Sequence, residues 1–179
     1  MKKLVLLILI VCGVSVQAQQ EKVDWMSMNE ALAAQKKQPK NILMDAYTTW
    51  CGPCKMLDKN TFSDPRVAKY INEHFYAVKF NAEGQEEINY KDETYANPGY
   101  NEKLKGRNSP HQFARALQIN AYPSIVFFNE DGEVIAPLKG YKTPEQIEIY
   151  LAVFAKDDYK KLTSEKAWED YKLNFESTF

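Results

Sequence analysis

The sequence predicts an α/β fold in which a mixed central sheet has helices on both of its faces. Short apolar runs with strand character alternate along the chain with segments that carry helix start signals, which is typical of a largely parallel sheet. An Asp-Gly pair at 131–132 follows the most strand-like run and predicts a hairpin, which makes the last strand antiparallel. The 179 residues, 45% of them hydrophobic and 26% charged, are enough for one domain with a packed core.

Helix start signals set the positions of the expected helices. Ser27 and Glu30 form a capping box, and Asp64 followed by Pro65 supplies an N-cap and a proline at the first helical position. A second capping box lies at 143–146, and a Ser-Pro pair lies at 109–110. These signals and the apolar spacing between them predict helices over 27–37, 51–59, 64–75, 109–118 and 143–156.

Four apolar runs have the length and composition of strands, at 41–47, 76–81, 124–129 and 133–136. Between the second and third runs, residues 82–109 form a long polar excursion with three tyrosines. The tail has the apolar spacing of one more amphipathic helix. We therefore expect a domain over 19–157 with an insertion at 82–109, followed by a C-terminal helical extension over 158–179.

The first residues have the composition of a secretory signal peptide over 1–18. Lys2 and Lys3 precede an apolar run, and small residues predict cleavage after Ala18. The run is shorter than the roughly 20 apolar residues that a membrane span needs. Cys12 follows Val11, which is not small, so we expect this cysteine to leave with the signal rather than carry a lipid. The mature protein is thus expected to cross the inner membrane and to be soluble in the periplasm.

The charge of the chain argues against a nucleic-acid partner. The formal net charge is −1, and loss of Lys2 and Lys3 changes it to −3. No basic stripe occurs along the sequence, whereas nucleic-acid binding requires a concentrated positive surface.

Two of the three cysteines, Cys51 and Cys54, form one Cys-x-x-Cys motif. A bond that closes so small a loop stabilises a fold little, which argues against a purely structural disulfide. A zinc site needs four ligands as a rule, and His74 and His111 do not lie at metal-ligand spacing. The pattern therefore favours redox chemistry, with no metal and no cofactor.

The motif places each residue where thiol chemistry needs it. Cys51 follows a strand and opens a helix, where unpaired N–H groups and the helix dipole stabilise a thiolate. Cys54 lies one helical turn further on, within reach of a mixed disulfide formed by Cys51. Gly52 permits a tight turn, and Pro53 has no N–H group to lose at a helix start.

Residues 42–55, which contain the string Trp-Cys-Gly-Pro-Cys, resemble the active-site segment of the thioredoxin family. The continuation Thr-Phe-Ser-Asp-Pro-Arg-Val at 61–67 resembles a narrower branch, which includes the periplasmic thioredoxin-like domain of DsbD-type thiol reductases. The resemblance covers about residues 25–155, with 82–109 as a departure. It implies a thioredoxin-like fold and thiol–disulfide oxidoreductase activity.

The resemblance also implies two residues that assist the cysteines. Asp45 matches the buried acid of the family, and burial in an apolar strand would raise its pKa and let it take the Cys54 proton. Lys79 matches the lysine beside that acid and would lower the Asp45 pKa. The alternatives are a solvated, idle Asp45 and an outward-facing Lys79.

The remaining expected site residues would contact the substrate. Pro123 matches the cis-proline that faces the cysteine pair, and the Tyr122 backbone would align the substrate like an added strand. Trp50 would shield the sulfurs, and Gly140 matches a glycine beside the site, where a side chain would block approach. The expected substrate-binding residues are Trp50, Gly52, Pro53, Tyr122, Pro123 and Gly140.

The Gly-Pro pair between the cysteines resembles the reducing members of the family, so we expect a reductase of protein disulfides. An exported reductase needs electrons from inside the cell, supplied through a membrane thiol-reductant transporter. Two alternatives remain. One is a specialised apocytochrome c thiol reductase. The other is a redox-silent binding module that presents the tyrosines of 82–109 to a partner, unless these tyrosines pack on the domain.

Overall fold

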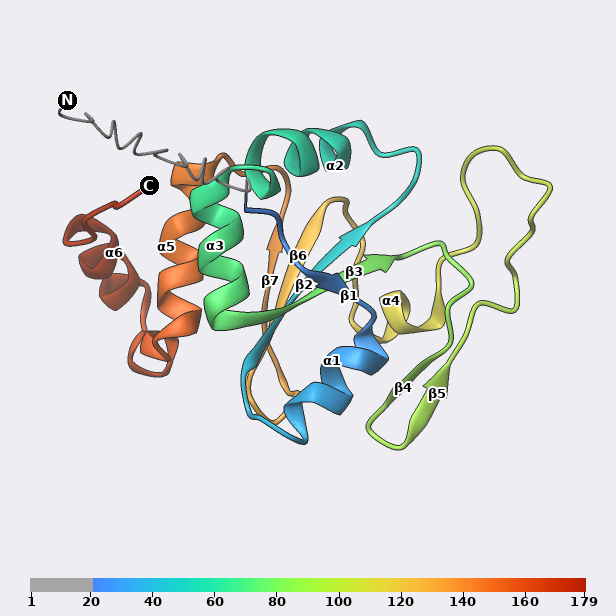
Figure 1. The fold of residues 1–179 in the computed structure, drawn as a ribbon, viewed down its shortest axis with the longest axis horizontal. Coiled ribbons are helices and arrows are strands. Elements are labelled where there is room, and N and C mark those ends of the chain that lie inside the picture. Colours follow the sequence, from blue (N-terminus) through green and yellow to red (C-terminus); the bar gives the residue numbers. More distant parts are fainter. Residues whose placement is uncertain (1–20) are drawn as a thin grey trace, which may run out of the picture.

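The computed structural model describes residues 21–179, and a five-stranded mixed sheet lies at its centre (Figure 1). The expected signal peptide, with Cys12, lies outside these residues. The strand order is β1-β3-β2-β6-β7, in which β1, β3 and β2 are parallel and β6 and β7 are antiparallel to their neighbours. This is the predicted mixed sheet. The strands are β1 (Trp25–Met26), β2 (Asn41–Tyr47), β3 (Phe75–Asn81), β6 (Ser124–Phe128) and β7 (Val134–Lys139).

Helices cover both faces of the sheet, as predicted (Figure 1). One face packs against α1 (Met28–Gln35) and α4 (Gln112–Ala116). The other packs against α2 (Gly52–Leu57), α3 (Pro65–His74) and α5 (Pro144–Ala155). The capping boxes at Ser27 and Thr143 are both formed.

The central strand β2 contributes to the core on both faces. Ile42, Met44 and Ala46 belong to the apolar cluster beneath α1 and α4, whereas Leu43 belongs to the cluster beneath α3 and α5. Because side chains alternate along a strand, Asp45 shares the face of Leu43. The acid therefore lies under the helix layer that includes α2.

Three local features differ from the sequence-based expectation. The polar lead-in over 19–25 ends in β1, which pairs with β3. The helix expected over 51–59 ends as α2 at Leu57 and continues as a π-helical turn, Asp58–Phe62. The helix expected from 109–110 begins at Gln112 instead, because His111 is its N-cap and its ring Nδ1 accepts from the Phe113 N–H at 3.0 Å.

The segment 82–109 contains a small hairpin of β4 (Ile88–Tyr90) and β5 (Glu93–Tyr95). Its turn residues, Lys91 and Asp92, both have positive φ, as a type I′ hairpin turn requires. Tyr90 is buried against Phe113, with the ring centroids 5.3 Å apart. The Tyr95 ring lies 5.4 Å from the same phenylalanine. These two tyrosines therefore pack on the domain rather than forming an exposed adhesive surface.

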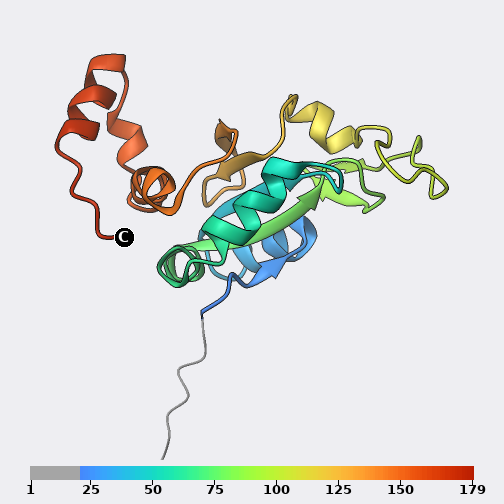
Figure 2. The same ribbon diagram turned by 90° about the horizontal axis from the view of Figure 1, so that it is seen from above.

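The tail forms a 3-10 turn, Asp158–Lys161, and then α6 (Glu165–Leu173), which is the expected amphipathic helix. Figure 2 places α6 and the loop before α4 at opposite ends of the molecule. The division into a domain over 19–157 and an extension over 158–179 stays a prediction. Across residues 21–179, no helix combines the length and apolar character that a membrane crossing would need.

Candidate active site

Cys51 and Cys54 form a disulfide at the start of α2, with an S–S distance of 2.10 Å and a Cα–Cα distance of 5.3 Å. Cys51 is the N-cap of the helix, and its Sγ accepts from the backbone N–H of Cys54 at 3.1 Å. The strand, the turn and the helix thus hold the two sulfurs as the motif predicted. The same N–H group and the helix dipole would stabilise a thiolate on Cys51 after reduction.

A groove of about 640 Å³ lies beside the disulfide. Cys51, 3% exposed, lines this groove, whereas Cys54, 2% exposed, does not. Cys51 is therefore the sulfur that a substrate in the groove meets first. Of the six expected substrate-binding residues, four line the groove, namely Trp50, Gly52, Pro53 and Tyr122.

The other two, Pro123 and Gly140, do not line the groove and lie next to one another. The Tyr122–Pro123 peptide bond is cis, as expected, and the Gly140 N–H donates to the Pro123 carbonyl at 2.8 Å. Gly140 has a φ of +80°, so its backbone alone disfavours a side chain. A Cβ there would have only ordinary contact with Lys142, and any role of this glycine toward a substrate stays a prediction.

Asp45 is completely buried, and Lys79 is its partner. The Lys79 Nζ lies 2.6 Å from Asp45 Oδ2, and it also donates to the carboxylate of Asp58. Burial raises the Asp45 pKa to about 6, although Lys79 opposes the change. Asp45 Oδ1 has no hydrogen-bond partner in the described part of the chain. The solvated Asp45 and the outward-facing Lys79 are therefore wrong as alternatives.

Three charged residues of this region were not identified from the sequence. Asp58 follows Cys54 by four residues, so helical spacing could have placed it on the same helix face. Glu83 accepts from the Trp50 indole N–H at 2.8 Å, and the Arg107 guanidinium carbon lies 4.2 Å from the centroid of the Trp50 ring. No sequence signal places Glu83 and Arg107 here, because their positions depend on the path of the segment 82–109.

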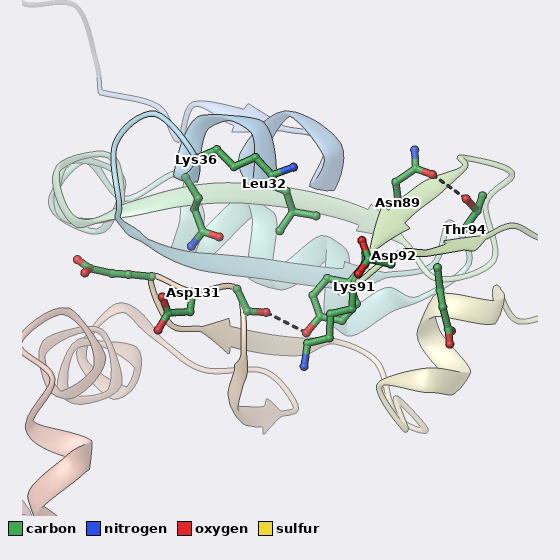
Figure 3. A pocket seen from close by; sticks show the side chains of 12 residues that line it. Leu32, Lys36, Asn89, Lys91, Asp92, Thr94 and Asp131 are labelled. Carbon is green, nitrogen blue, oxygen red and sulfur yellow. Dashed lines mark hydrogen bonds between the residues drawn. The ribbon is translucent and has the colours of Figure 1, made fainter.

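Between residues 21 and 179, no group of three or more His, Cys, Asp or Glu residues is arranged to hold a metal ion. A second pocket lies between α1, the β4–β5 hairpin and the turn at 130–132 (Figure 3). It is at the other end of the sheet from the cysteines, and the Tyr90 hydroxyl closes one side by donating to the Gly132 carbonyl at 2.8 Å. Its lining contains no thiol and no histidine.

Comparison with known proteins agrees with this geometry. The model of the thioredoxin-like domain family matches residues 28–155. A thiol:disulfide interchange protein DsbD from Pectobacterium atrosepticum is 28% identical over 130 residues, which are 72% of this chain and 18% of that protein. The chain therefore spans less than a fifth of this curated relative.

Two solved structures share the fold. A thioredoxin-fold protein from Helicobacter pylori has a TM-score of 0.59 at 19% identity, covering 83% of this chain and 84% of that one. A thioredoxin from Thermus thermophilus has a TM-score of 0.50 at 15% identity, covering 89% of this chain and all of that one. The mixed sheet flanked by helices is thus the fold of thioredoxin-fold proteins.

Proposed function

The chain belongs to the thioredoxin-like family, and from this premise we propose that it is an exported reductase of protein disulfides. The observation that carries the proposal is the Cys51–Cys54 disulfide at the start of α2, with Cys51 alone of the two sulfurs lining the groove. The signal-like sequence at 1–18 supports export to the periplasm. A membrane thiol-reductant transporter would then return the protein to its dithiol form.

In the proposed reaction, the Cys51 thiolate attacks one sulfur of a substrate disulfide. A bond forms between Cys51 and that sulfur, and the other substrate sulfur leaves as a thiolate and takes a proton. Cys54 then loses its proton and attacks the Cys51 sulfur, which releases the second substrate thiolate. The two electrons that reduce the substrate come from the dithiol, which ends as the disulfide in the present structure.

Asp45 is the base that we assign to the second attack. Its position on the β2 face beneath the α2 layer and its raised pKa allow the carboxylate to accept a proton near neutral pH. The free Oδ1 provides a place for that proton or for a water that carries it. Lys79 keeps the carboxylate ionised before the transfer, because the ammonium stabilises the negative charge.

Insulin reduction tests this proposal directly. The wild type should precipitate insulin chains in the presence of a dithiol reductant, and Cys51→Ser should abolish the reaction. Cys54→Ser should capture substrates as stable mixed disulfides on Cys51, which mass spectrometry identifies. A wild type without insulin activity, or a Cys51→Ser variant that retains it, would refute the enzyme and leave a binding module.

A redox titration tests the direction of electron flow. A reductase should have a potential near that of thioredoxin, about −270 mV, whereas a potential near −120 mV, as in DsbA, would indicate an oxidant. Covalent capture on the Cys54→Ser variant in the native host also tests the apocytochrome c alternative, because that substrate would dominate the captured proteins.

A further inference from the structure

The segment that precedes α4 is tied to the active-site tryptophan through one buried carboxylate. Glu83 is 8% exposed, and its Oε2 accepts both the Trp50 indole N–H and the Asn108 backbone N–H at 2.8 Å. Asn97 closes the base of the segment by donating to the carbonyls of Gly84 and Ser109 at 2.9 and 2.7 Å. The two ends of the stretch 97–109 are thereby fixed to the domain, whereas residues 101–107 between them are exposed.

This stretch places Arg107 on the wall of the groove. The guanidinium carbon lies 4.2 Å from the centroid of the Trp50 ring, which is within the range of a cation–π contact. Arg107 is exposed, and it pairs with no carboxylate of residues 21–179. A guanidinium stacked on an aromatic ring keeps its N–H edge available, and that edge fits a carboxylate in a bidentate manner.

Among the charged groups of the groove, Arg107 is the one that a substrate would contact. Glu83 is the only carboxylate of the lining, and it faces two N–H donors from the protein. The exposed Lys139 lies outside the lining, but its Nζ donates to the side chain of Asn120, which lines the groove. The exposed charge of the groove lining is therefore positive, although the chain as a whole has a net charge of −1.

We propose that the groove selects disulfides that carry an acidic side chain next to the attacked cysteine, and that Arg107 determines this specificity. The inference rests on the proposed reductase function and adds a substrate class to it. Charge complementarity of this kind changes rates of association more than it changes final affinity. Its effect should therefore be largest in the second-order rate constant of the first attack and at low salt.

The substrates are two matched peptides, each closed by a disulfide. They differ only in the residue beside one cysteine, which is Glu in one peptide and Lys in the other. The reduced protein is mixed with each peptide, the reaction is quenched with acid, and the second-order rate constants are compared. We expect the wild type to react about tenfold faster with the Glu peptide. Arg107→Gln should bring the ratio close to one, and Arg107→Glu should invert it. Because each ratio is taken within one variant, general changes in thiol reactivity cancel.

Lys105→Gln is the matched control, because it removes the same charge from the same stretch at a residue that does not line the groove. This variant should keep the wild-type ratio. Reduction of the uncharged 2-hydroxyethyl disulfide tests the reductase function separately from the proposed specificity. A wild type that does not reduce it lacks the proposed function itself. A wild type that reduces it but treats both peptides alike, or an Arg107→Gln variant that keeps the full preference, overturns the specificity proposal alone.

Discussion

The Lys79 ammonium connects the buried carboxylate of Asp45 with that of Asp58 on the π-helical turn after α2. The Nζ atom lies 2.6 Å from Asp45 Oδ2, and β2–β3 pairing places the two residues directly opposite one another. Asp45 is inaccessible to solvent, whereas the Asp58 side chain is partly exposed. One cation thus links the interior beneath α2 with the surface, and both Lys79, which lowers it, and Asp58, which raises it, affect the pKa of Asp45.

The first prediction concerns the base in the second attack. Asp45→Asn should slow the resolution of the mixed disulfide about 10²-fold at pH 7, because the amide cannot accept the Cys54 proton. Formation of the mixed disulfide by Cys51 should change much less. Rapid acid quench followed by mass spectrometry measures the two steps separately. Equal rates of resolution in the variant and the wild type would remove Asp45 from the mechanism.

The second prediction concerns two substitutions that should shift the Asp45 pKa in opposite directions. Lys79→Met should raise the Asp45 pKa above about 6, because the ammonium stabilises the ionised acid. Asp58→Asn should lower it, because a like charge is removed and Lys79 is left to Asp45 alone. NMR titration of the Asp45 carboxyl carbon in the oxidised protein measures both midpoints. Movement of the two midpoints in the same direction would contradict the linked arrangement.

The third prediction concerns stability against pH. The Asp45 pKa rises from 3.8 in the unfolded chain to about 6 in the fold, so the folded state binds the proton more tightly. The contribution of Asp45 to the unfolding free energy is fully present below pH 3.8. It falls by about 3 kcal/mol in total as the pH rises through 6. The variant Asp45→Asn has no such proton to lose. The unfolding free energy of Asp45→Asn, measured relative to that of the wild type, should therefore increase by about 2 kcal/mol from pH 4 to pH 8.

Urea unfolding of both proteins in the disulfide form measures this difference, and Glu145→Gln on α5 is the control. The Glu145 side chain is exposed and does not contribute to the Asp45 pKa, so this variant should keep the pH profile of the wild type. A difference between Asp45→Asn and the wild type that stays constant from pH 4 to pH 8 would contradict the raised pKa.

Sequence reasoning predicted the parts of the fold that depend on local signals. The capping boxes at Ser27 and Thr143, the hairpin after the Asp-Gly pair and the placement of Cys51 at a helix start were all confirmed. The cis bond before Pro123 was also expected, but only through family resemblance, because the residues themselves favour the trans isomer.

The features that were missed depend on contacts between distant residues. β1 is two residues long, and parallel pairing with β3 defines it rather than any apolar pattern. The β4–β5 hairpin turns at Lys91 and Asp92 without a glycine, so the usual turn signal is absent. Glu83 and Arg107 reach Trp50 from positions 33 and 57 residues away, which no spacing rule anticipates.

The last prediction concerns how the tail is attached. Glu148 on α5 is only 2% exposed, and its carboxylate accepts from the Ser177 hydroxyl at 2.5 Å and from the Thr178 N–H and hydroxyl at 2.5 and 2.6 Å. Burial raises the Glu148 pKa, but these hydrogen bonds lower it by more, so the net pKa is below its ordinary value. The Phe179 ring beyond them lies 5.9 Å from that of Tyr70 on α3.

Glu148→Gln should release this end of the chain, because the amide presents an N–H group where the fold supplies only donors. We expect a loss of about 1–3 kcal/mol in unfolding free energy and faster hydrogen exchange over 175–179. Glu145→Gln, at an exposed position on the same helix, should cause neither change. Because the folded pKa is lowered, the wild type should lose the same contribution as the pH falls below 4.5. Unchanged exchange at 175–179 in Glu148→Gln would show that Phe179 and its neighbours, rather than the carboxylate, hold the tail in place.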